Sequence, residues 1–137
     1  ASDNPAYSLS NLTNLGRIDM NDTHLAIGCY PGGSSFKVLE LSMLSSPSYQ
    51  TVPGKDCPSE VSFNDKGFFI PDNDNIIGWN SVADALAGSS PTMSFGGRTD
   101  KSNMGTKMAA GIGWDGYHFW VGEYKFSNRL LGFAPSK

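Results

Sequence analysis

The segment PDNDN, residues 71–75, concentrates hard oxygen ligands of the kind that calcium sites use. It lacks the twelve-residue spacing and the closing glutamate of an EF-hand, and Asp and Asn in a short turn more often bond their own backbone. We therefore expect a structural turn at these residues and no cofactor in the protein. A bound Ca²⁺ ion is the alternative.

Two histidines, His24 and His118, each follow a short turn that contains Asp. Metal-dependent hydrolases and lyases need several His or carboxylate ligands around one metal ion, and the two histidines of this chain supply only two such ligands. The Ser-rich turns lack the strand–elbow–helix context of a serine nucleophile, and GGRTDKSNMGTK, residues 96–107, has no Walker pattern. We predict no catalytic residue, and the enzyme interpretation is the alternative.

Composition indicates one turn-rich globular domain. The chain has 137 residues, of which 39% are hydrophobic and 17% charged, with 16 Gly and 8 Pro. The net charge of −3, without a basic run, argues against nucleic acid as a partner, and no apolar run approaches the length of a membrane helix. The N-terminal sequence ASDNPAYS fits a mature exported chain as well as a trimmed one. Cys29 and Cys57 are compatible with one disulfide, which their number and spacing alone do not require.

Short apolar runs bounded by Gly, Asn, Asp or Pro predict an all-β chain, with one short helix in SVADALAG, residues 81–88. Three segments repeat the order strand, tight turn, strand, polar loop, strand. Their turn aspartates are Asp22, Asp65 and Asp115, spaced by 43 and 50 residues, which is the spacing of propeller blades. The units cover residues 17–52, 59–97 and 108–133, and the segment 5–11 supplies a further outer strand. The competing fold is a small β-sandwich.

The third unit, GIGWDGYHFWVGEYKFSNRLLGF, resembles a blade of the NHL-repeat β-propeller family, with Ser127-Asn128-Arg129 where the family has Asn-Asn-Arg. The likeness is fair in the second unit, around NIIGW, and weakest in the first. There, Cys29-Tyr30-Pro31 replaces the Ala-Asp turn of the family. The resemblance implies a single NHL-like domain over residues 1–137, with three four-stranded antiparallel blades per chain.

The family's ring has six blades, so the resemblance further implies that another chain completes it. A homodimer needs the fewest assumptions, with the segment 5–11 of each chain closing the third blade of the other. A different second chain is the alternative.

In a propeller blade, with strands A to D numbered outward from the axis, the D–A and B–C connections emerge on one face. Cys29 and Cys57 fall on this loop face in neighbouring blades, so we predict a disulfide between them. We also predict that this face binds a protein or glycan ligand. The candidate binding residues are Tyr30, Asp72, Asp74, Arg98, Glu123, Tyr124 and Phe126.

The function that we predict is an exported, extracellular or periplasmic binding or assembly module without catalytic activity. It has no nucleic-acid partner and no membrane span. The alternatives are a propeller-type metal-dependent lyase or lactonase, and a structural subunit of an extracellular filament or surface complex.

Overall fold

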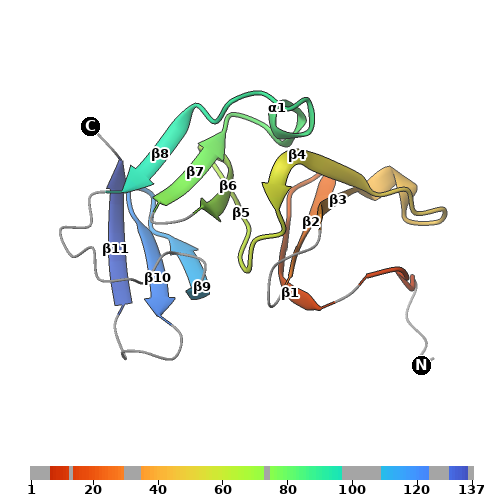
Figure 1. Cartoon of the computed structure of the whole chain (residues 1–137), viewed down its shortest axis with the longest axis horizontal. Coiled ribbons are helices and arrows are strands. Elements are labelled where there is room, and N and C mark those ends of the chain that lie inside the picture. Colours follow the sequence, from red (N-terminus) through yellow and green to blue (C-terminus); the bar gives the residue numbers. More distant parts are fainter. Residues whose placement is uncertain are drawn as a thin grey trace.

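The computed structural model describes residues 7–12, 14–29, 35–72, 75–96, 109–123 and 130–135. Within these ranges the chain is all-β, with antiparallel sheets and one short α-helix, as the sequence predicts (Figure 1). No helix in the described ranges is long and apolar enough to cross a membrane.

The first unit is a four-stranded sheet in which each strand pairs with the next along the chain. Its order is β1-β2-β3-β4, and a bulge between Leu15 and Ile18 interrupts the pairing of β1 with β2. A short 3₁₀ turn, Leu41–Met43, separates the last two strands. The strands are β1 (Leu15–Met20), β2 (His24–Cys29), β3 (Ser35–Glu40) and β4 (Gln50–Asp56).

The second unit has the same order, β5-β6-β7-β8, and the predicted helix α1 lies between its last two strands. Ser81 caps the start of this helix, because its side chain accepts a hydrogen bond from the Asp84 N–H at 3.1 Å. The elements are β5 (Ser62–Asn64), β6 (Gly67–Asp72), β7 (Asn75–Trp79), α1 (Val82–Leu86) and β8 (Met93–Gly96).

The third unit does not form the separate four-stranded blade that the sequence predicts. Its strands β9 (Ala109–Trp114), β10 (Phe119–Glu123) and β11 (Leu130–Pro135) pair with one another, and β11 also pairs with β8 through Ala134 with Gly96 and Pro135 with Phe95. The sheet therefore has seven strands, in the order β5-β6-β7-β8-β11-β10-β9. Within the described residues no further strand follows β11, and the unpaired backbone groups of its edge bond the nearest strand end.

The two edge strands of this seven-stranded sheet, β5 and β9, contact each other, so that the sheet is nearly closed and barrel-like. The indole Nε1 of Trp114 at the end of β9 donates a hydrogen bond to Asp65 Oδ1 after β5 at 2.9 Å. On its other side β5 contacts β1 of the first sheet, where the Phe63 N–H donates to Asp19 Oδ2 at 2.7 Å. The first strands of the three units, β1, β5 and β9, thus lie next to one another in this order.

The core consists of two apolar clusters on opposite faces of the second unit, which lies between the other two units (Figure 1). Successive side chains of β6 point to opposite faces. Phe68 accordingly packs toward the first sheet, with its ring 5.9 Å from that of Phe36, and Phe69 packs toward the third unit, with its ring 4.8 Å from that of Phe119. Burial on both faces explains the uninterrupted apolar run in this strand.

A disulfide joins Cys29 at the end of β2 to Cys57 just after β4, which confirms the predicted pairing. The segment after β4 also bonds the first sheet through its backbone, since the Cys29 N–H donates to Pro58 O at 2.8 Å and the Arg17 N–H to Ser59 O at 3.2 Å. Gly28 makes this close approach possible, because a Cβ there would lie 2.9 Å from Pro58 O. The disulfide therefore secures the crossing from the first unit to the second.

The described part of the predicted outer strand, Tyr7–Leu12, contains no strand within the single chain. It is attached to its own first sheet by two side chains. Tyr49 Oη donates to Ser10 O at 2.9 Å, and Lys37 Nζ donates to Asn11 O at 2.8 Å. Pairing of this segment with another chain stays a prediction.

Candidate functional site

Each of the three units makes the same side-chain-capped turn between its first two strands. In the first unit Asn21 Oδ1 accepts the N–H groups of Thr23 and His24 at 2.9 and 2.8 Å. In the second, Asn64 Oδ1 accepts the Lys66 N–H at 2.8 Å. In the third, Asp115 Oδ1 accepts the N–H groups of Tyr117 and His118 at 2.8 and 2.7 Å.

The equivalent residues of the repeat are therefore Asn21, Asn64 and Asp115, which corrects the alignment on Asp22 and Asp65 by one position. The repeated turn explains why His24 and His118 occupy corresponding places.

Because the side-chain oxygens of Asn21 and Asn64 face backbone N–H donors, their amide orientations are settled by the bonding, and each NH₂ group points away from its own turn. Asn64 Nδ2 is buried and has no hydrogen-bond partner within the described part of the chain. A buried donor without an acceptor costs about 1–3 kcal/mol, so native structures rarely leave one unused.

The turns of the first and second units and the start of α1 enclose a cleft of about 340 Å³. Its volume lies in the range typical of small-molecule sites. The lining combines amide and hydroxyl groups, one cation, one carboxylate and one aromatic ring, from residues that include Asn21, Phe63, Asn64, Asp65, Lys66 and Ser81. The cleft is thus able to donate and accept hydrogen bonds and to offer an apolar surface.

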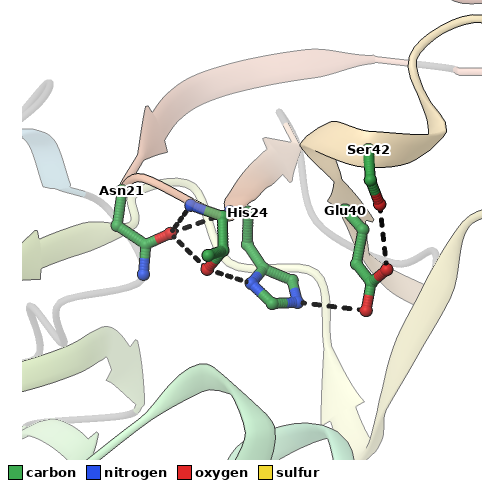
Figure 2. A network of polar contacts seen from close by, with 5 residues as sticks. Asn21, His24, Glu40 and Ser42 are labelled. Atoms are coloured by element: carbon green, nitrogen blue, oxygen red, sulfur yellow. Dashed lines mark hydrogen bonds and ion pairs between the residues drawn. The ribbon is translucent and has the colours of Figure 1, made fainter.

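His24 also borders the cleft, and its two ring nitrogens lie beside groups of the first sheet (Figure 2). Its Nδ1 lies 2.8 Å from Thr23 Oγ1, which donates its own hydrogen to Asn21 Oδ1 at 3.1 Å. The Thr23 oxygen is therefore the acceptor of a His24 Nδ1–H. On the other side, Nε2 lies 3.9 Å from Glu40 Oε1, and Ser42 Oγ donates to Glu40 Oε2 at 3.3 Å.

This network connects the start of β2 to the end of β3, and only 14% of the His24 side chain is exposed. A general base needs a ring nitrogen directed at a substrate proton. Here both ring nitrogens face groups of the chain itself. The geometry therefore favours a structural role for His24, at the contact between the start of β2 and the end of β3, over a catalytic one.

The carboxylates with the most perturbed pKa values lie outside the cleft. Burial raises the pKa of Glu60 to about 7, and the Arg17 guanidinium opposes this shift only in part, since Arg17 Nε lies 3.6 Å away on an exposed side chain. Hydrogen bonds from the His118 backbone, from the Trp120 indole and from the Tyr117 backbone hold the pKa of Asp115 well below its usual range. Both pKa shifts have structural causes. Glu60 is buried where the chain passes from the first unit to the second, and Asp115 caps the turn between β9 and β10.

Among the residues that the sequence predicts to bind a ligand, Asp72 has a described side chain, and its Oδ2 accepts a hydrogen bond from Lys55 Nζ at 2.8 Å. Glu123 ends β10, and its side chain lies outside the described part. The remaining predicted residues lie outside the described residues, namely Tyr30, Asp74, Arg98, Tyr124 and Phe126.

The cleft lies at the other end of the strands from these loops, and our sequence analysis missed it. A signal was present in the two Asn-Asp pairs, 21–22 and 64–65, at the same place in two units.

No group of three or more His, Cys, Asp or Glu side chains is arranged to hold a metal ion in the ranges that the structure describes. Comparison with known proteins yields no match to a protein family, a curated protein or a solved structure.

Proposed function

We propose that this protein is an exported, non-catalytic binding module that holds one neutral, hydroxyl-rich ligand group, such as a sugar residue, in the cleft between its Asn21 and Asn64 turns. The observation that carries this proposal is that Asn64, a residue of the cleft lining, has a buried side-chain amide without an acceptor in the described part of the chain. Because Nδ2 is closed to solvent in the single chain, a ligand oxygen accepts the unused hydrogen bond when the Asn64 side chain turns toward the cleft, which removes the cost of leaving that bond unmade.

The rest of the lining suits the same class of ligand. A sugar hydroxyl both donates and accepts, and the cleft supplies donors at the Asn21 and Asn64 amides and an acceptor at the Asp65 carboxylate. The Phe63 ring provides the apolar surface on which the C–H face of a sugar packs. Since Asp65 and Lys66 bring opposite charges, with Lys66 Nζ 3.7 Å from Asp65 Oδ2, a neutral ligand fits better than a strongly charged one.

We further propose that the three units are blades of an NHL-like half propeller. Three features support this: the unbroken strand order within the first two units, the packing of successive units against opposite faces of the second, and the succession β1, β5, β9 of first strands in contact. The disulfide supports an oxidising compartment, extracellular or periplasmic. The loop face that carries Asp72 stays a second proposed surface, for a protein or larger glycan.

The test is a titration of ¹⁵N-labelled protein with neutral monosaccharides, namely glucose, galactose, mannose and N-acetylglucosamine, followed through the side-chain amide signals. We expect one of these sugars to shift the Asn64 NH₂ signals in a saturable manner. Asn64→Asp keeps the oxygen that caps the turn and removes the donor, so it should weaken binding at least about tenfold.

The matched control is Asn11→Asp, the same chemical change at an exposed position outside the cleft, which should bind like wild type. The proposal is wrong if none of the sugars shifts the Asn64 signals, or if Asn64→Asp and Asn11→Asp bind equally well. Shifts confined to the residues around Asp72 would place the ligand on the loop face instead.

A further inference from the structure

The outward surface of the third unit is a sheet face whose described strand residues carry no charge and which no layer of the described chain covers. Phe119, Val121 and Phe133 point into the core, so the alternate residues of the same strands point outward. The described outward residues form what we call the tryptophan face: Gly111, Gly113, Trp120, Gly122, Leu130 and Gly132.

Trp120 forms a fixed platform on this face. Gly113 and Gly132 are its cross-strand neighbours, a Cβ at Gly132 would lie 3.2 Å from the indole ring, and the indole Nε1 donates to Asp115 Oδ2 at 2.8 Å. By contrast, a Cβ added at Gly111, Gly113 or Gly122 would meet no described atom within 4 Å. The tryptophan face therefore consists of one aromatic ring beside a hollow at Gly111, Gly113 and Gly122, where the backbone itself forms the surface. Glycine within a strand often marks a site where another surface approaches the backbone closely.

The opposite end of the stack presents protruding aliphatic side chains on β1. Ile18 and Met20, which we call the β1 face, are 60% and 53% exposed. Asp19, which alternates with Ile18 and Met20, points the other way and accepts the Phe63 N–H of the second unit. Ile18 and Met20 therefore project from the side of the first sheet that the second unit does not cover.

We propose that two copies of this chain form a closed dimer in which the tryptophan face of each copy packs against the β1 face of the other. The aliphatic side chains of the β1 face fill the glycine hollow, and Met20 is suited to contact an indole ring. Within one chain the two faces cannot meet, because the second unit lies between them (Figure 1). A two-fold axis uses both faces of both copies and leaves neither apolar surface in water.

This inference rests on the proposed half propeller, for which it names the partner and the contact, and it does not depend on the ligand of the cleft. The apolar, glycine-floored contact continues the face-to-face packing that already joins the three units within the chain.

The test uses the full, disulfide-bonded chain in sedimentation velocity and native mass spectrometry. Gly122→Glu places a charge in the hollow at a position where the single chain has room, and Ile18→Lys places one on the β1 face. Each variant alone should raise the dimer dissociation constant at least about 100-fold. Ser90→Glu and Ser90→Lys, at an exposed position away from both faces, are the controls and should dimerise like wild type.

The decisive sample is an equimolar mixture of Gly122→Glu and Ile18→Lys. In a mixed dimer one contact has two wild-type faces, and the other brings the introduced glutamate of one copy against the introduced lysine of its partner, so the mixture should recover the dimer. The proposal is overturned if the wild-type chain stays monomeric up to about 100 µM, if it forms open-ended oligomers, or if the mixture does not recover. A monomer that still shows the sugar-dependent shifts of Asn64 would refute the dimer and leave the binding proposal standing.

Discussion

Glu60 makes the stability of this protein depend on pH in a direction opposite to that of a salt-bridged carboxylate. It lies in the segment that follows the disulfide, and only 4% of it is exposed. Arg17, which forms an ion pair with Glu60, is largely in water and its Nε is 3.6 Å away, so burial dominates and raises the pKa of Glu60 to about 7 from the ordinary 4.5.

The folded chain therefore holds a proton on Glu60 at pH values where the unfolded chain has released it. Between about pH 4.5 and 7 the folded state binds more protons, so the free energy of unfolding falls as the pH rises through this window. The difference between the two pKa values corresponds to about 3 kcal/mol, which is lost in full above the upper value. For a domain with a few kcal/mol of net stability, this is a large fraction.

The assay compares urea unfolding of wild type and Glu60→Gln at pH 4, 6 and 8, because the glutamine keeps the shape and does not ionise. Wild type should lose about 3 kcal/mol relative to Glu60→Gln between pH 4 and pH 8. Arg17→Met removes the opposing cation, so it should move the midpoint of this loss to higher pH. The reasoning is refuted if the difference between wild type and Glu60→Gln is constant over this range.

Two further predictions concern packing and the covalent link. Gly78→Ala should lower the free energy of unfolding by about 1–3 kcal/mol because its Cβ would clash with the Phe69 ring, whereas Ser90→Ala, at an exposed position, should change it by less than about 0.5 kcal/mol. Equal effects in urea unfolding would contradict the described packing. Replacing Cys29 and Cys57 together by Ala should cost about 3–4 kcal/mol through the freed loop, whose ends are 28 residues apart in the sequence, and a double variant as stable as the oxidised wild type would contradict this.

Much of the local structure follows from residue order. Alternating apolar runs bounded by Gly, Asn and Asp place the strands, and Ser81 marks the start of the helix. Strands that follow one another along the chain also pair with one another in most of the two sheets. These features depend on neighbours within a few residues, which is why the sequence alone reveals them.

Features that depend on which sheet edges pair and which distant segments meet could not be predicted from the sequence. The pairing of Phe95 and Gly96 with the end of β11 arises because an edge without its own outer strand bonds what lies nearest in space. The cleft forms where turns 43 residues apart in the sequence meet, Asn21 and Asn64, and its main signal is a donor that the fold buries without an acceptor.

The sequence by itself determined the β class, the short helix and the strand–turn–strand order, because periodicity and turn chemistry are local properties. Only the tertiary structure decided that the third unit joins the sheet of the second, that Asn64 borders a cleft, and that apolar faces terminate both ends of the stack. Burial and hydrogen-bond satisfaction are set by which distant segments meet, and that is a property of the whole packed chain.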